Sequence, residues 1–306
     1  MQFSNGKGRS AVIWGAGALF TLLFIAFISS NYNKPTSIED TYKNITEKKE
    51  LLAQMRIHLL QSVEMEKNAV MALTDEESQE FAGQSLIASA TVDQSLKTLR
   101  SRIDTGPLQE EKKLVEEFST CWTEFRKLDQ IILELAVQNT NLHAASLSRE
   151  KGDAAMQRFE RAIEVMIQLY AGTPNEGRVT RLLCHAMTAG LKMYNLHSPH
   201  IAEASDEKMD RIEAQMQAEE NEVAKSLEAL TGIIDEEHRD SALQAKTAFA
   251  DFMAVTSEVI KLSRQNSNIK SLELSLGKKR KLTAQCDEIL ATFQETVQSR
   301  TFKATR

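Results

Sequence analysis

Side-chain amides occur where they could form a polar site inside an otherwise apolar core. The stretch Gln138-Asn139-Thr140-Asn141 recurs in the second half of the chain as Gln265-Asn266-Ser267-Asn268. Asn139 and Asn266 fall on the apolar stripe of a predicted helix, where an unpaired buried amide costs roughly 1–3 kcal/mol. Paired amides would form a polar layer that fixes helix register, as a core asparagine does in coiled coils. Alternatively, Gln138, Asn139, Gln265 and Asn266 line a small ligand-binding cavity, or the register leaves both asparagines exposed.

The amide stretch belongs to a longer internal repeat. On the same offset Trp122 falls on Phe249 and Phe125 on Phe252, and with a gap of four residues Thr74-Asp75-Glu76 falls on Ser205-Asp206-Glu207. Self-similarity of this kind indicates that one structural unit is used twice. It weakens any interpretation of the chain as a single enzyme domain.

The histidines lack the spacing that a metal site needs. His197 and His200 flank Pro199, with His185 upstream. The proline disturbs the helical register that would bring two imidazoles onto one ion, and no Glu-x-x-His pair occurs. We therefore expect no metal.

Cysteine chemistry and catalysis are equally unsupported by the sequence. Cys121, Cys184 and Cys286 lie far apart, and an odd number cannot form a closed disulfide framework. We expect Cys121, beside Trp122, to be a small core residue. A glycine-rich phosphate loop and a nucleophile elbow are both absent from the sequence, so we expect no cofactor and no enzyme.

The composition favours long helices. The 306 residues leave room for two domains and include only 12 Gly and 4 Pro, with 6% aromatic residues, as in bundles filled by aliphatic side chains. The net charge of −6 gives no electrostatic reason to expect a nucleic-acid partner.

An uncharged apolar run covers residues 11–28. As a helix it would be about 27 Å long, enough to cross the hydrocarbon core. Lys7 and Arg9 precede it and predict a cytoplasmic N-terminus, with everything after about Asn31 outside the cytoplasm. The competing interpretation is a cleaved signal peptide, although the residues after Ile28 make a poor cleavage site. The sequence thus predicts a single-pass signal anchor at 11–30 after a cytoplasmic segment at 1–10.

Apolar residues at steps of three and four predict four helices in each half of the remaining chain. In the first half, helix two begins at Thr74-Asp75-Glu76-Glu77, helix three ends in a turn at 150–153, and helix four ends at 172–177. The second half repeats this plan, with a turn at Gly277-Lys278, a kink or restart at Ser198, and helices at 178–204, 206–232, 236–275 and 278–303. Short turns make successive helices antiparallel. The predicted fold is therefore all-α: an N-terminal transmembrane helix followed by two tandem antiparallel four-helix bundles, at 31–172 and 173–306.

A resemblance to a known family rests on the sequence of the predicted third helix. This helix contains Glu117-Phe118-x-x-x-Trp122-x-x-Phe125, followed by the asparagine-rich stretch and by Ala144-x-x-Leu147. Together with the four-helix plan, these motifs resemble the extracytoplasmic sensor domain of bacterial methyl-accepting chemotaxis receptors. The chain departs from that family in having two bundles, and it shows no second membrane helix and no cytoplasmic signalling coiled coil. We expect a sensor-like ectodomain without its output part.

The resemblance implies a homodimer whose ligands engage polar residues on helices one and four. The residues that could serve by position, none matching a family motif, are Arg56, His58, Arg149, Arg181, His185 and Lys192. We expect each of them on a solvated face, like the basic run 278–281.

The function expected from the sequence is that of a sensor-like protein of the bacterial inner membrane. Such a protein would bind a small molecule or a partner protein and relay its state by protein contacts. Because no helix is expected to lead back from the second bundle, only helix one of the first would touch the membrane. The alternative is a structural or adaptor module of the cell envelope with no small-molecule ligand.

Overall fold

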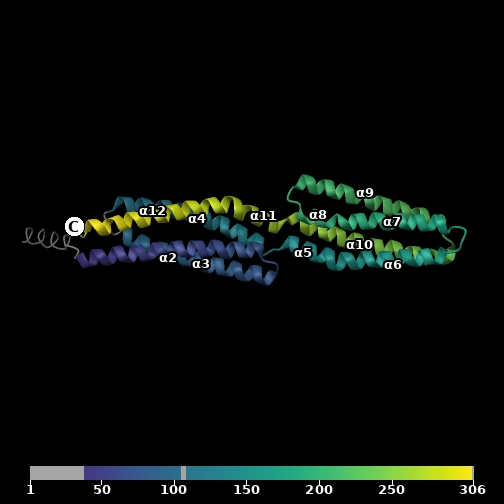
Figure 1. The fold of residues 1–306 in the computed structure, drawn as a ribbon, viewed down its shortest axis with the longest axis horizontal. Coiled ribbons are helices and arrows are strands. Elements are labelled where there is room, and N and C mark those ends of the chain that lie inside the picture. Colours follow the sequence, from purple (N-terminus) through teal and green to yellow (C-terminus); the bar gives the residue numbers. More distant parts are fainter. Residues whose placement is uncertain (1–37, 105–107, 305–306) are drawn as a thin grey trace, which may run out of the picture.

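A computed structural model describes residues 38–104 and 108–304, and all the regular structure in these residues is helical. The predicted cytoplasmic segment at 1–10 and signal anchor at 11–30 lie outside the described residues. None of the described helices combines the length and the apolar character needed to cross a membrane. The helices form a long rod made of two bundles placed end to end (Figure 1).

One bundle contains both ends of the described chain, and we call it the proximal bundle. Its helices are α2 (Ile38–Met71), α3 (Asp75–Asp104), α4 (Gln109–Ala136) and α12 (Arg280–Ala304). Its core is lined by Leu52, Leu59, Phe118 and Phe125 from the first three-helix stretch and by Phe293 from α12. A helix from the C-terminal end of the sequence thus completes a core begun at residue 38.

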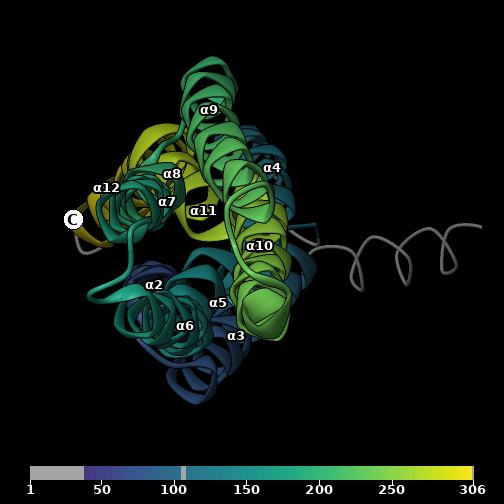
Figure 2. The same ribbon diagram turned by 90° about the vertical axis from the view of Figure 1, so that its right-hand side faces the viewer.

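The other bundle, which we call the distal bundle, lies at the far end of the rod. Its helices, seen end-on in Figure 2, are α6 (Asp153–Tyr170), α7 (Glu176–Asn195), α9 (Asp206–Thr231) and α10 (Arg239–Gln265, after the 3₁₀ turn η2, Glu236–His238). Phe159, Met166, Leu183 and Phe252 are fully or almost fully buried in its core. The predicted all-α class is confirmed. Each bundle contains helices from both of the predicted segments, 31–172 and 173–306, because α12 packs with α2 and α4 while α6 packs with α7 and α10.

The predicted turns at 150–153 and 277–278 are wrong. The short helices α5 (Thr140–Leu147) and α11 (Ser267–Leu274) continue through the π-helical turns η1 (Ser148–Gly152) and η3 (Ser275–Lys279) into α6 and α12. Gly152 has ordinary helical angles, φ −64° and ψ −49°. A Cβ at this position would lie 3.3 Å from the Tyr194 ring, so the glycine serves close packing and not a turn.

Other predicted boundaries are confirmed. Thr74 caps α3, because the Glu77 N–H donates to Thr74 Oγ1 and the Leu73 N–H donates to Glu77 Oε2. Gly172, with φ +75°, lies in the turn that follows the end of α6 at Tyr170. The restart predicted near Pro199 occurs two residues earlier than expected, since α7 ends at Asn195 and α8 covers His197–Ala202.

The path of the chain corrects one more expectation. From the distal bundle, α10, α11, η3 and α12 lead back along the rod, and α12 ends at the same end where α2 begins (Figure 1). A return path from the distal bundle to the proximal end is therefore present. Helix one is not alone at that end.

Candidate functional site at the junction of the two bundles

The duplicated asparagines break two long helical rods between the bundles. Asn139 separates α4 from α5, and Asn266 separates α10 from α11. Their φ angles are +48° and +58°, in the left-handed region that asparagine tolerates better than most residues. Both side chains are buried, while Gln138 and Gln265 beside them are exposed.

The two breaks lie against each other in a reciprocal arrangement. The Thr140 N–H donates to Ser267 Oγ at 3.1 Å, and the Ser267 N–H donates to Thr140 Oγ1 at 3.1 Å. One position further, the Asn141 N–H donates to Asn268 Oδ1 at 3.1 Å and the Asn268 N–H to Asn141 Oδ1 at 3.2 Å. These are first-turn N–H groups, which have no acceptor within their own helix. Each copy of the motif thus caps the helix that begins in the other copy.

The amide side chains complete the junction. Asn141 Nδ2 donates to Asn266 Oδ1 at 2.8 Å, and Asn268 Nδ2 donates to Asn139 Oδ1 at 3.0 Å. Asn139 Nδ2 also donates to Asp75 Oδ1 at 2.9 Å. These contacts are those of the polar layer considered from the sequence. Ligand binding by Gln138, Asn139, Gln265 and Asn266 stays a prediction.

Asp75 connects the junction to the surface. Its carboxylate accepts from Asn139 and also lies 3.0 Å from His143 Nε2. The hydrogen bond from Asn139, followed by that from His143, lowers the pKa of the Asp75 carboxyl. A cleft of about 340 Å³ opens beside it, lined by Leu73, Asp75, Leu142, His143, Ser146 and Arg149 among others.

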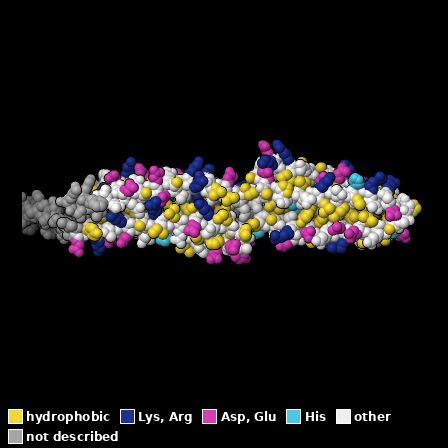
Figure 3. All heavy atoms as spheres, in the orientation of Figure 1, with side chains coloured by type: hydrophobic (Ala, Val, Ile, Leu, Met, Phe, Trp, Pro, Cys, Tyr) yellow, Lys and Arg dark blue, Asp and Glu magenta, His cyan; other side chains and the backbone are white. Residues whose placement is uncertain are grey.

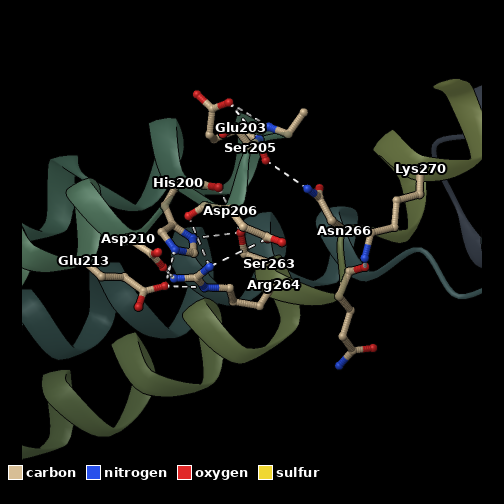
Figure 4. Close-up of polar contacts among 12 residues, drawn as sticks. His200, Glu203, Ser205, Asp206, Asp210, Glu213, Ser263, Arg264, Asn266 and Lys270 are labelled. Atoms are coloured by element: carbon tan, nitrogen blue, oxygen red, sulfur yellow. Dashed lines mark hydrogen bonds and ion pairs between the residues drawn. The ribbon is translucent and has the colours of Figure 1, made fainter. Parts of the chain in front are cut away.

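A charged network continues from the junction into the distal bundle (Figure 4). Arg264, two residues before Asn266, ion-pairs with Glu213 at 2.7 Å and with Asp210, both from α9. His200 Nε2 lies 2.8 Å from Glu213 Oε1, and His200 Nδ1 lies 2.9 Å from Ser263 Oγ. The hydrogen bond that Arg264 donates to Glu213 lowers the pKa of the Glu213 carboxyl and raises the pKa of the Arg264 guanidinium. The network joins α8, α9 and α10 at the end of the distal bundle that meets the junction.

The comparison with known families shows which family this chain belongs to. The model of the four-helix-bundle sensory module for signal transduction matches residues 14–173, more than half of the chain. The chain belongs to this family. No curated protein and no solved structure matches it. The family resemblance expected from the sequence is thereby confirmed, while the two tandem copies and the missing output part stay predictions.

His197 of this sensory module packs as a neutral core group. His197 Nδ1 lies 2.8 Å from Ser148 Oγ, and His197 Nε2 lies 3.0 Å from Thr256 Oγ1. Burial lowers the pKa of His197 to about 4, assisted by the charge of His200. Among the described residues, no group of three or more His, Cys, Asp or Glu side chains is arranged to hold a metal ion.

The other residues named by position have ordinary surroundings. Arg56 forms a bidentate ion pair with Asp287, with Nε 2.6 Å from Oδ1 and Nη2 3.0 Å from Oδ2. This pair joins α2 to α12. Lys192 lies 3.2 Å from Glu219 on the surface. The remaining four have exposed or half-buried side chains: His58, Arg149, Arg181 and His185.

Cys121 is a buried core residue, as expected, but its disulfide was not predicted, and the expectation for the basic run 278–281 is wrong at Lys279. Cys121 of α4 and Cys286 of α12 form a disulfide, with their Cα atoms 5.8 Å apart, and only Cys184 is free. An odd number of cysteines excludes a closed framework but not a single bridge, and the pair was not predicted because the two cysteines are 165 positions apart in the sequence. Lys279, from the basic run expected on the surface, is 1% exposed.

The surface of the sensory module offers two grooves of ligand size. One, of about 580 Å³, lies between α3 and α4 and is lined by Leu86, Asp93, Trp122, Arg126, Lys127 and Glu134 among others. The other, of about 650 Å³, lies between α6 and α10 and is lined by Arg158, Arg161, Val165, Asp240, Leu243 and Asp251 among others. On the face shown in Figure 3, acidic and basic side chains alternate without a large patch of one sign. Neither groove could be found from sequence, because each is lined by helices distant in the chain or by residues of an ordinary solvated face.

Proposed function

We propose that this chain is the extracytoplasmic sensor of a bacterial inner-membrane protein, anchored through residues 11–28. One of the two bundles would receive a small molecule or a partner protein, and the helices of the proximal bundle would pass its state to the membrane. The relay would use protein contacts. The family membership supports a sensory role in signal transduction, whereas the ligand and the anchoring belong to the proposal.

The observation that carries the relay is the reciprocal junction. Two helical paths, α4–α5–α6 outward and α10–α11–α12 back, cross between the bundles. They are tied together at Thr140 and Ser267. A displacement of α10 in the distal bundle therefore reaches α12 directly and α4 through the junction. In signalling proteins, helix shifts of 1–2 Å are a common means of transmission.

The disulfide supports a position outside the cytoplasm. Disulfides persist in oxidising compartments such as the bacterial periplasm and are rare in the cytosol. The Cys121–Cys286 bridge joins α4 to α12, the two proximal helices that cross the junction. It would make these two helices move as one unit against α2 and α3.

The two grooves are the proposed places for a small molecule. Their volumes of about 580 and 650 Å³ lie within the range of small-molecule sites, which is roughly 300–1,000 Å³. Each presents side chains of both charges beside apolar ones. Zwitterionic or anionic metabolites suit such a lining.

A thermal-shift screen of the purified full-length chain tests the proposal. Amino acids, organic acids and other metabolites are added in turn, and a ligand that binds only the native state raises the melting temperature. For any ligand found, Lys127→Gln and Arg161→Gln report which groove holds it, because each removes one cation from one groove. If a broad screen gives no shift while crosslinking in cells captures one stable envelope partner, the adaptor alternative replaces the sensor.

A further inference from the structure

Four polar side chains meet in the core of the proximal bundle at the level of the π-helical turn η3. They are Glu66 from α2, Asp129 from α4, and Ser275 and Lys279 from η3, and none is more than 1% exposed. We call this group the Glu66 cluster. Three of its members are ionisable, which is unusual for the interior of a helical bundle.

Only part of the charge in the Glu66 cluster is paired. Lys279 Nζ forms an ion pair and hydrogen bond with Asp129 Oδ1, and it lies 3.8 Å from the centre of the Phe125 ring. Within residues 38–104 and 108–304, both Glu66 oxygens, Asp129 Oδ2 and Ser275 Oγ have no hydrogen-bond partner of acceptable geometry. Arg126 Nη1 approaches Asp129 Oδ2 only to 3.6 Å. A buried carboxylate without a donor is unfavourable as an anion, and a bound proton removes the charge.

The repeat supplies an internal comparison. On the offsets of the repeat, Glu66 corresponds to His197, Asp129 to Thr256, Ser275 to Ser148 and Lys279 to Gly152. In the distal bundle these positions form a neutral layer in which the His197 ring bonds Ser148 at 2.8 Å and Thr256 at 3.0 Å. Both copies have a π-helical turn at this level. The backbone is thus conserved between the bundles, and the charged side chains are particular to the proximal one.

The charges around Glu66 determine which way its proton equilibrium moves. Burial raises the pKa of the Glu66 carboxyl, Lys279 opposes this, and the repulsion from Asp129 adds to it. Ser275 of η3 and Lys67 of α2 also favour the anion. At neighbouring turns α3 presents the buried uncharged residues Ser78, Ala82 and Ser85, and α11 presents Ser271.

We propose that Glu66 is a proton-binding site, so that the proton is itself a ligand of the proximal bundle. A proton from solvent binds one Glu66 oxygen, and the neutral acid then has an O–H donor among unpaired acceptors. When the proton leaves, the new carboxylate competes with Asp129 for Lys279. Lys279 is the last residue of η3 and directly precedes α12. A change in its ion-pair partner from Asp129 to Glu66 therefore acts on α12, the helix that ends beside the start of α2.

The proton site is tested on the purified full-length chain by infrared spectroscopy and unfolding. The carbonyl stretch of a buried carboxylic acid is expected to persist in the wild type at pH values above the ordinary 4.5 and to be absent in Glu66→Gln. In urea, a raised folded-state pKa means that the native state holds more protons than the unfolded state above pH 4.5, the ordinary value. Wild-type stability should therefore fall with rising pH from there up to the folded-state pKa, and Glu66→Gln should lack this fall.

The matched control is Glu64→Gln, which removes an exposed carboxylate from the same helix. It should retain both the infrared band and the wild-type pH dependence. A wild type without the acid band, or with a pH dependence parallel to that of Glu66→Gln, overturns the proposal. The infrared band of the wild type decides the question even if Glu66→Gln does not fold.

The coupling to α12 rests on the proposed sensory function and has its own readout. Amide hydrogen exchange over residues 275–283 should change between acidic and neutral pH in the wild type and not in Glu66→Gln. If the metabolite screen finds no ligand, the sensory function fails while a titrating Glu66 stands. If Glu66 titrates near its ordinary value, the proton site is wrong whatever ligand is found.

Discussion

Thr140 and Ser267 each cap the helix that begins at the other, through two N–H to hydroxyl hydrogen bonds of 3.1 Å. The two residues are 127 positions apart and occupy the same place in the repeat. The duplicated motif therefore pairs with its own copy within one chain. This relationship holds the two crossing paths together between the bundles.

Removing the mutual caps should reveal an energetic coupling between the two copies. Thr140→Val and Ser267→Ala should each lower the free energy of unfolding by about 1 kcal/mol, the usual cost of losing a cap. In urea unfolding, the double variant should lose less than the sum of the single ones, because both changes remove the one hydroxyl–hydroxyl hydrogen bond, 3.2 Å long, between Thr140 Oγ1 and Ser267 Oγ. Thr188→Val is the control, since that exposed hydroxyl bonds only within its own helix. Strictly additive losses would contradict the hydroxyl–hydroxyl contact between the two copies.

The left-handed backbone at Asn266 predicts an unusual order of substitutions. Both Asn266→Gly and Asn266→Ala lose the amide contacts to Asn141 and Glu203. Only alanine adds the strain of a Cβ at φ +58°, which costs about 1–2 kcal/mol. The glycine variant should therefore have the higher urea midpoint, opposite to the order in a helix interior. An alanine variant as stable as the glycine variant would mean that the rod is not broken at this residue.

The sequence predicted the helices well because the apolar residues recur at helical spacing along each of them. The helix start at Thr74 and the end near Gly172 followed from local side-chain chemistry. These features depend on residues close in the chain. The family resemblance rested on the same periodicity and is confirmed.

The sequence could not predict how the two halves combine. Gly152 lies in a stretch, 150–153, whose composition is typical of a turn. In the structure it is part of a π-helical turn, where the lack of a side chain allows close packing of the Tyr194 ring. Asn139 fits the stripe of a continuous helix, yet its partners in the other copy stabilise a break. In both cases the deciding contact comes from a distant residue. Local pattern therefore favoured two bundles in succession, where the structure has two bundles that share crossing helices.

The disulfide between α4 and α12 should contribute strongly to the stability of the proximal bundle. Replacing Cys121 and Cys286 by alanine should lower the free energy of unfolding by about 2–5 kcal/mol, while Cys184→Ala, at an exposed free thiol, should have little effect. Peptide mapping of the purified protein under non-reducing conditions should recover the 121–286 linkage. Three free thiols in that experiment would show that the bridge does not form.

The buried His197 should make the distal bundle sensitive to acid. Its folded-state pKa of about 4 lies below the ordinary 6.5, so the unfolded state binds more protons between these values. Stability should therefore be lost as the pH falls from about 6.5 toward 4, by up to about 3 kcal/mol in total.

A glutamine at His197 provides the test, because it cannot titrate and is close to imidazole in size. Urea unfolding between pH 4 and 7 should show a shallower acid loss for His197→Gln than for the wild type, whereas His185→Gln, at an exposed position, should keep the wild-type slope. This dependence has the opposite sign to the one expected for Glu66, whose proton stabilises the fold. Two repeat-equivalent positions would then respond oppositely to acid, the proximal bundle gaining stability where the distal bundle loses it. Equal slopes for wild type and His197→Gln would show that the ring is charged or solvated in the folded protein, and the neutral distal layer would have to be abandoned.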